Sequence, residues 1–406
     1  MKLTYLRYVV ENLRHRQLRS WLTVLGIIVG FAAVVGIFSV GQGLQSSIEE
    51  QFAELGGDKI IVQEKGFGGS PTVTVKGFFS EQDLDAVKGT RGIAEAAGYF
   101  LQGATIEVDD ERQVSFAIGI PTNNDEDFEL VVETFTLKVG EGRQLQEGDA
   151  DAVALGSRFG NELDIFQKRV RVRDSIDING QKFTVVGIYQ SIGNPVDDSH
   201  VYLSLDAMER LYGVKDEFTA IMARVTPGSV PRQVADDVED ELRDLRNVEK
   251  GKEDFFAETF EQLIETFTTV LNVVKIVLVL IAVISLAVGV VNIMNTMYTA
   301  VLERTQEIGL MKSIGARNED IRDIFLLESG IIGIIGGVLG VFSGWLLAQG
   351  LSAIAAAAGF TILKPFFPWW LGVGAVLISF VVGMLSGVLP AIQASQLSPV
   401  EALRYE

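Results

Sequence analysis

The sequence predicts a membrane protein with four transmembrane α-helices and an α/β extracytoplasmic domain inserted between spans 1 and 2. The 406-residue chain has a mean hydropathy of +0.29, and its long charge-free runs can each cross a hydrocarbon core of roughly 30 Å. Between Gly43 and Glu265 there are 44 Asp and Glu against 22 Lys and Arg, a net charge of −22, whereas the rest of the chain carries +3. This acidic region is expected to be a separate soluble domain that avoids nucleic acid and anionic membrane surfaces.

The N-terminal region predicts an anchored first span that starts from the cytoplasm. Leu3, Leu6, Val10 and Leu13 recur at helical spacing, so residues 1–19 are expected to form an amphipathic helix on the membrane surface. The cations before the first apolar run favour the cytoplasmic side and are Lys2, Arg7, Arg14, Arg16 and Arg19. The alternative, a cleaved signal peptide, lacks a small-residue cleavage site, and its apolar run would be too long.

Four spans place both termini in the cytoplasm and one large domain outside the plasma membrane. The expected parts are the cytoplasmic helix (1–19), span 1 (20–42), the outer domain (43–265), a stalk end with span 2 (266–296), a cytoplasmic loop (297–323), span 3 (324–351), an outer connection (352–367), span 4 (368–390) and a cytoplasmic tail (391–406). The tail is expected to form a short helix after a proline stop at Pro390.

Small residues and single charges mark helix contacts and interfaces within the spans. Gly26 and Gly30 form a small-xxx-small pair that permits close helix packing. Span 3 carries a stripe of three glycines that are also expected to pack against a helix, Gly336, Gly340 and Gly344. Lys275, near the start of span 2, is expected to extend its amine to the headgroups. Glu328 is either a buried functional carboxylate or an interfacial one, and the few apolar residues before it favour the interface.

The outer domain is expected to alternate strands and helices, which is typical of an α/β fold. Expected strands are 59–63, 72–75, 105–108, 114–120, 152–155, 175–178, 182–189, 200–203 and 219–225. Expected helices are a helix capped by Ser80 to residue 88, 127–134, a helix capped by Asp206 to residue 212, 231–245, and 256–267. Asn179-Gly180 is a strong two-residue turn signal and predicts a hairpin.

The composition excludes several kinds of site. The chain has no cysteine, so it has no disulfide, thiolate metal site or cysteine nucleophile. Only His15 and His200 are available, and the acidic clusters lack the glycine-centred pattern of a calcium loop, so no metal is expected. No G-x-x-x-x-G-K-[ST] loop is present, so any ATP and magnesium are expected in a partner chain rather than as cofactors of this one.

The segment between spans 2 and 3, VLERTQEIGLMKSIGAR (301–317), mixes charges with recurring apolar residues. This mixture suits a short amphipathic helix at the membrane surface that offers one face to a soluble partner. Gly309 and Gly315 allow a bend and a helix stop. An ordinary solvated turn between spans is the alternative.

ERTQEIGLMKSIGAR closely resembles the cytoplasmic loop of MacB/FtsX-like permeases, whose usual pattern is ERT-x-EIG-x-x-K/R-x-x-GA. The first span and the tail GVLPAIQASQLSPVEALRYE resemble the same family. GEGRQLQEGDADAVALGSRFG and INGQKFTVVGIY resemble its MacB-type outer domain, which implies porter-like ends and an inserted lobe at about 121–215. By this resemblance the loop is a coupling helix that contacts an ATPase, through Glu303, Arg304, Thr305, Glu307, Ile308, Gly309, Leu310, Lys312, Gly315 and Ala316.

The resemblance implies a non-catalytic permease subunit of an ABC transporter. Its expected partners are a separate ATPase, a second copy or a paralogous permease, and in some relatives an extracytoplasmic adaptor. ATP-driven movement of the coupling helix would be relayed to the outer domain for export or extraction of a substrate, with Ile308 and Leu310 as apolar anchors on the ATPase. Two alternatives are an FtsX-like regulator that activates a cell-wall hydrolase, and a membrane-anchored enzyme that uses outer-domain carboxylates.

Overall fold

The computed structural model describes residues 17–65, 78–161, 164–361 and 363–404, and these form two compact units. The helical unit contains the chain up to Ser46, Thr269–Ala355 and the chain from Leu363 onward. The α/β unit contains Ser47–Thr268 and Ala356–Ile362. The strand expected at 72–75, and the amphipathic helix expected at 1–19 as far as residue 16, lie outside the described residues.

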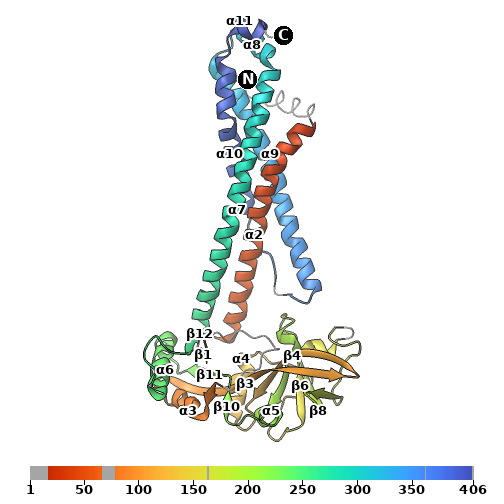
Figure 1. Cartoon of the computed structure of the whole chain (residues 1–406), viewed down its shortest axis with the longest axis vertical. Helices are drawn as coiled ribbons and strands as arrows, with labels where there is room; N and C mark the ends of the chain where they lie inside the picture. Colours follow the sequence, from red (N-terminus) through yellow and green to blue (C-terminus); the bar gives the residue numbers. More distant parts are fainter. Residues whose placement is uncertain (1–16, 66–77, 162–163, 362, 405–406) are drawn as a thin grey trace. The chain divides into compact units, whose positions relative to one another are not determined.

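Within the described chain, four helices are long and apolar enough to cross a membrane (Figure 1). They are α2 (Gln17–Leu55), α7 (Phe260–Glu303), α9 (Asn318–Ala357) and α10 (Trp369–Gln396). The short helices α8 (Thr305–Ser313) and α11 (Pro399–Arg404) contact each other. The expected helix stop at Pro390 is wrong, because Pro390 is buried inside α10, which continues to Gln396. A proline removes one backbone hydrogen bond, and packed neighbouring helices let the later turns continue.

The four long helices share one apolar core. Ile27 and Phe31 of α2, Ile293 of α7, Ile332 of α9 and Ala375 of α10 are all buried in it. Outside this core most of α7 is exposed and apolar, with only 17% of its most apolar window buried. This distribution is expected of a helix that contacts lipid on most of its circumference.

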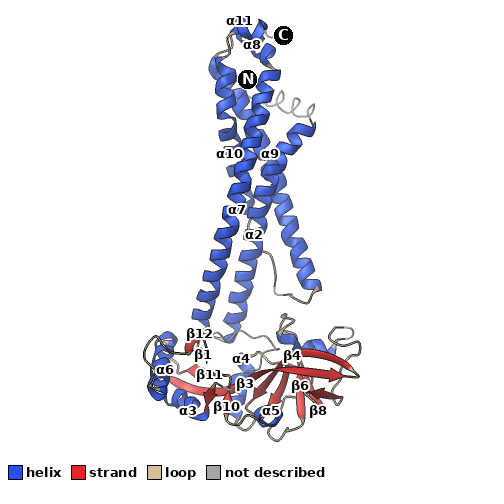
Figure 2. Ribbon diagram, viewed as in Figure 1, coloured by secondary structure: helices blue, strands red, loops and turns tan. Residues whose placement is uncertain are grey.

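A ten-stranded sheet forms the centre of the α/β unit (Figure 2). Its main path runs in the order β12, β1, β11, β3, β4, β9, β6, β8 and β5, and β7 pairs with β3 and β8. The strands are β1 (Lys59–Glu64), β3 (Ile93–Val108), β4 (Glu111–Ile120), β5 (Val139–Gly142), β6 (Ala152–Leu155), β7 (Ser175–Ile178), β8 (Gln181–Tyr189), β9 (Val201–Ser204), β11 (Ala220–Val225) and β12 (Phe255–Thr259). A separate two-stranded sheet pairs β2 (Phe79–Ser80) with β10 (Glu217–Phe218).

Strand β3 belongs to both halves of the α/β unit. Its first part, Ile93–Tyr99, pairs with β11, and its second part, Phe100–Val108, pairs with β4. The sequence pattern detected only the end of this 16-residue strand, because alanines and glycine interrupt the alternation of its first part. The strands of the second half therefore begin near Phe100, before the lobe limit expected at residue 121.

Three of the helices described in the α/β unit start at a capping side chain, and one of these caps is the predicted residue. They are α3 (Glu81–Gly89), α4 (Asp125–Thr134), α5 (Leu205–Tyr212) and α6 (Pro231–Arg246), with single 3-10 turns at Ser157–Gly160 and Asp197–Ser199. Ser80 forms a capping box with Asp83, which confirms its predicted role. The cap of α5 is Ser204, two residues before the expected Asp206, because the Ser204 hydroxyl accepts from the Ala207 amide. Asn179 and Gly180 both have positive φ in the predicted hairpin.

Helices α2 and α7 are each joined to one of two neighbouring strands, β1 and β12. Only Gly56–Asp58 separate the end of α2 from β1, and β12 leads directly into α7. β1 and β12 pair in antiparallel fashion from Ile60↔Thr259 to Glu64↔Phe255. The helix expected at 256–267 is therefore corrected, because its first residues form β12 and the helix begins at Phe260. The alternating burial of Phe255, Ala257 and Thr259 is the strand signal that the sequence reading missed.

Candidate functional site

The candidate site is α8, which lies between α7 and α9 in the helical unit. Its start is set at Arg304, whose φ of −109° and ψ of 18° interrupt the helix that α7 would otherwise continue. Its end is a Schellman motif, in which the Gly315 amide donates to the Lys312 carbonyl and the Ala316 amide to the Met311 carbonyl. Gly315 has a φ of +101°, which few L residues adopt, so the predicted helix stop is confirmed.

One face of α8 is exposed, and its residues recur at a spacing of three to four. The exposed side chains of α8 are Gln306, Glu307, Leu310 and Ser313. Together with the flanking exposed residues Glu303, the last residue of α7, and Ile314, the C-cap of α8, we call this set the outward face. Leu310 is 60% exposed and Ile314 is 80% exposed. Helical spacing brings such residues to one side, so the outward face combines two large apolar groups with two carboxylates.

The opposite face of α8 is buried in the helical unit. Arg304 is 8% exposed, Thr305 is 6% exposed and Ile308 is fully buried. Ile308 belongs to the same core cluster as Ile321 and Phe325 of α9. The expectation that Ile308 anchors a partner is therefore wrong for this structure, because its side chain is already packed. Leu310 is the exposed residue of the expected pair.

Arg304 forms a buried ion pair with Glu328 of α9. The distance from Arg304 Nη1 to Glu328 Oε2 is 2.8 Å, and Glu328 is 5% exposed. Of the two expectations for Glu328, the structure bears out a buried carboxylate, whereas an interfacial depth in the membrane stays a prediction. The reason is tertiary: a buried carboxylate requires a charged or hydrogen-bonding partner, and Arg304 supplies it from another helix.

Lys312 attaches α8 to the end of α10. Its Nζ donates to the Ser395 carbonyl at 2.6 Å and to the Leu397 carbonyl at 2.7 Å. Carbonyl groups at a helix C-terminus lack intrahelical partners and carry partial negative charge, so a cation is favourable there. Desolvation in this position lowers the pKa of Lys312. Lys312 was expected to contact a partner, but in this structure its amine is bonded within the chain.

The glycines expected at helix contacts lie at close approaches between helices. A Cβ at Gly340 would lie 2.7 Å from the Cβ of Phe31, and one at Gly344 would lie 2.7 Å from the Ala32 carbonyl oxygen, both on α2. Gly336 meets the Ile27 side chain in the same way. Gly26 and Gly30 face α7 at Gly289 and Leu286, respectively. A larger residue on the Gly340–Gly344 stripe would require α2 and α9 to separate.

A cavity of about 380 Å³ lies between α2, α7 and α9. Its lining is apolar apart from Lys275, whose Nζ donates to Gln45 Oε1 at 3.3 Å. The sequence reading placed the Lys275 amine among headgroups. In the structure the amine is bonded to α2, and the methylene chain of Lys275 contacts Gly41.

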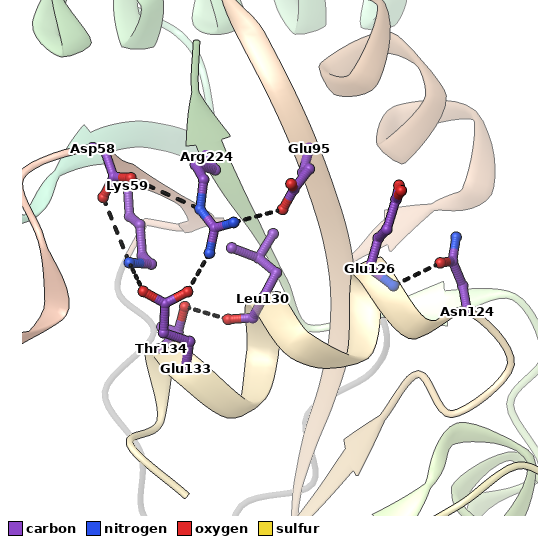
Figure 3. A network of polar contacts seen from close by, with 9 residues as sticks. All are labelled: Asp58, Lys59, Glu95, Asn124, Glu126, Leu130, Glu133, Thr134 and Arg224. Carbon is purple, nitrogen blue, oxygen red and sulfur yellow. Dashed lines mark hydrogen bonds and ion pairs between the residues drawn. The ribbon is translucent and has the colours of Figure 1, made fainter. Parts of the chain in front are cut away.

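The α/β unit contains a polar network that the sequence reading missed (Figure 3). Lys59 of β1 is 1% exposed, and its Nζ lies 3.0 Å from Glu133 Oε1 of α4 and 3.5 Å from Asp58 Oδ1. Arg224 of β11 pairs with the other oxygen of Glu133 and, at 2.9 Å, with Glu95 of β3. Basic residues inside apolar strands are a signal for such a network, because a buried cation needs acceptors.

The acidic segment near His200 is folded around its own hydrogen bonds. Asp198 accepts from the Ser191 hydroxyl at 2.6 Å and from the Ile192 amide at 2.9 Å, and Asp197 accepts from Asn194 at 2.6 Å. Burial raises the pKa of Asp197 and lowers the pKa of His200 to about 4. Among the residues that the structure describes, no three His, Cys, Asp or Glu side chains converge on a possible metal position.

Two protein families match different parts of the chain. Residues 20–241 match the MacB-like periplasmic core domain, and residues 279–399 match the FtsX-like permease C-terminal domain. An uncharacterized ABC transporter permease of Methanocaldococcus jannaschii is 35% identical over 401 residues, covering 98% of this chain and 97% of that protein. The macrolide export ATP-binding/permease protein MacB of Chlorobium phaeobacteroides is 29% identical, covering 99% of this chain and 61% of that protein. The periplasmic region of MacB from Actinobacillus actinomycetemcomitans is a structural neighbour with a TM-score of 0.43 and 14% identity, covering 54% of this chain and 97% of that one.

Proposed function

Because this chain belongs to the MacB/FtsX-like family of ABC transporter permeases, we propose that it couples ATP hydrolysis in a separate ATPase to movement of its own extracytoplasmic domain. Related permeases are membrane components, and the chain lacks the phosphate-binding loop that an ATPase needs. The MacB relative, whose name includes ATP binding, is longer, and this chain covers 61% of it.

The outward face of α8 is the observation that carries this proposal. Exposed Leu310 and Glu307 lie on α8, whose opposite side is packed in the core, and exposed Glu303 and Ile314 flank its two ends. Large apolar groups ringed by charges are typical of a docking site for another protein, in which apolar residues supply affinity and charges set orientation. The ATPase is the partner that the family implies.

The order of the chain supports placing this face in the cytoplasm and the α/β unit outside. One long apolar helix separates the N-terminal cations from the α/β unit, and a second separates the α/β unit from α8. Crossing the membrane twice returns the chain to its original side. The cations before Trp21 assign that side to the cytoplasm, so both termini lie there as well.

The continuity of α2 and α7 supports mechanical transmission. At 1.5 Å per residue, the 44 residues of α7 span about 66 Å, roughly twice the hydrocarbon core. Because α2 and α7 are joined to the paired strands β1 and β12, a relative displacement of the two helices would load two neighbouring strands. We propose that two permease copies, or this chain and a paralogue, assemble with two ATPases, and that the movement serves export or extraction of a substrate, in some systems with an extracytoplasmic adaptor.

The double substitution Leu310→Asp/Ile314→Asp tests the proposal. The full chain is expressed with its cell's own ATPases, purified from membranes, and assayed for copurified ATP hydrolysis. The variant should accumulate normally, since both side chains are exposed, and copurified hydrolysis should fall at least about tenfold, because a central docking residue contributes about 2 kcal/mol or more. Val230→Asp, at a residue of the α/β unit that is 61% exposed, is the matched control and should change nothing. Normal hydrolysis with the double variant would contradict the docking role.

A further inference from the structure

The buried side of α8 has three attachments to the rest of the helical unit. Its backbone continues from α7 through Arg304, whose amide still donates to the Ala300 carbonyl at 3.1 Å. The Arg304 guanidinium reaches α9 at Glu328, at 2.8 Å. Lys312 reaches the end of α10 through two carbonyl groups. A nine-residue helix is thereby connected to three of the four long helices.

The Arg304–Glu328 pair differs from the surface ion pairs of this chain in its burial. The exposed side-chain fractions are 10% for Arg304 and 6% for Glu328. Desolvation offsets most of the attraction in such a pair, so a buried pair contributes little net stability compared with apolar packing. It does fix geometry, because a planar guanidinium and a carboxylate hold each other in a defined orientation and either charge alone is unfavourable in that position.

The position of the pair also matters. Arg304 lies at the break between α7 and α8, where the backbone could otherwise hinge. A load applied to the outward face of α8 would act on this break. Glu328 holds the same residue from α9, so the break cannot open without separating two buried opposite charges. Apolar contacts of Ile308 with α9 alone would permit sliding, since dispersion contacts are not directional.

From these contacts we infer that Arg304 and Glu328, together with Lys312, form a latch that makes α9 and α10 move with α8. This inference rests on the proposed function and adds to it a second route for the movement. Movement of α8, the ATPase-contacting helix, is then transmitted to α9 and α10 (spans 3 and 4) as well as to α7. Glu328 is a positioning residue in this route, because it acts through Arg304 and not through the ATPase.

The absence of cysteine in the chain allows a direct measurement. Cysteines are introduced at Met311 of α8, which is half-buried and lies outside the outward face, and at exposed Val338 of α9, and they carry spin labels in the full chain copurified with its ATPase. Labelled chains are diluted with unlabelled chains, so that only distances within one chain are measured. The distance distribution is recorded without nucleotide and after trapping with ATP and vanadate.

The expected result is a narrow distribution in the native chain, with the same mean in both states. Glu328→Gln and Arg304→Gln should each broaden it at least twofold after trapping, while the amount of copurified ATPase is unchanged. The exchange Arg304→Glu/Glu328→Arg should restore the narrow distribution. Glu319→Gln, an exposed carboxamide substitution on the first turn of α9, is the control and should leave the distribution narrow.

Distributions in Glu328→Gln and Arg304→Gln as narrow as the native one in both states would overturn the latch. If the single variants do not accumulate, the exchange Arg304→Glu/Glu328→Arg tests the latch instead, because a broad distance distribution in that variant would also overturn the latch. A pair that only stabilised the fold would lower abundance without broadening the distribution. Failure of the native chain to copurify an ATPase would contradict the proposed function. The nucleotide-free distributions would still test the latch, because the single variants should broaden them as well.

Discussion

Two buried cations of this protein, one in each unit, are stabilised in different ways. In the helical unit, Arg304 is paired with Glu328 and both side chains are enclosed. In the α/β unit, the Lys59 side chain is 1% exposed, but its acceptors Glu133 and Asp58 are each 50% exposed (Figure 3). Arg304 therefore has a carboxylate partner that is almost inaccessible to water, whereas the carboxylate partners of Lys59 are half exposed.

The difference shows that burial of a cation alone does not determine how much the fold depends on it. Removing Lys59 would return half-exposed carboxylates to water, and Glu133 would keep Arg224. Removing Glu328 would leave an arginine that cannot lose its proton in a site with little access to water. The cost of losing a partner is therefore set by the solvation of the group that remains.

The largest effect is expected for Glu328→Ala. The variant should lose about 3–5 kcal/mol of stability, because Arg304 stays charged without its partner. The measurement is thermal unfolding of the full chain in detergent. Arg304→Met/Glu328→Leu should recover most of this loss, since apolar residues of similar volume can replace a buried pair. If the Glu328→Ala variant unfolds at the same temperature as the native chain, water must solvate Arg304 once Glu328 is removed. That result would contradict the proposed difference between Arg304 and Lys59.

His200 is an enclosed titratable group of the α/β unit. Its pH dependence tests whether burial there changes stability as much as burial of the Arg304–Glu328 pair does. Its Nε2 has no hydrogen-bond partner among the residues that the structure describes, and Phe116 and Tyr202 pack against the ring, with Asp197 Oδ1 4.0 Å away. Burial lowers its pKa to about 4 from 6.5. The unfolded chain then binds more protons between these values, so stability should be complete above about pH 6.5 and fall as the pH decreases towards 4.

The total loss from His200 should be roughly 3 kcal/mol, at 1.36 kcal/mol for each pH unit. Unfolding of the full chain by urea between pH 5 and 6.5 measures at most about 2 kcal/mol of this loss, above the range of most carboxylates. His200→Phe keeps an aromatic ring beside Phe116 and Tyr202 and should flatten the slope. Asp197, whose pKa is raised, changes stability in the opposite direction as the pH falls. An equal slope in both proteins would assign the pH dependence to other groups.

A smaller effect is expected for Lys59→Met. The loss should be about 1–2 kcal/mol, because Glu133 keeps Arg224 and solvent while the apolar stem of Lys59 is replaced. Hydrogen exchange at β1, followed by mass spectrometry of the full chain, measures this loss of stability at the strand that contains Lys59. Arg112→Ala removes a pair in which the arginine is 72% exposed and should change stability by less than about 0.5 kcal/mol. A Lys59→Met loss as large as that of Glu328→Ala would remove the distinction between the two regions.

Local chemistry made several features predictable. Ser80 and Asp83 form their capping box within four residues, and Asn179-Gly180 takes the positive φ values that its hairpin needs. The first part of β3 and all of β12 were missed, because their pairing with β11 and β1 comes from distant segments. Short strands whose alternation is interrupted acquire their conformation from such partners.

The sequence by itself determined the four apolar helices, the acidic domain between the first two, and the helix between spans 2 and 3 with its stop at Gly315. It did not determine which side of that helix faces outward. Charges occur on both sides of so short a helix, with Glu303 and Glu307 outward and Arg304 and Lys312 inward, so the charge pattern alone could not tell which side is buried. Tertiary structure decided the matter, because Glu328, 24 residues further along the chain, can balance only the charge that packing brings beside it.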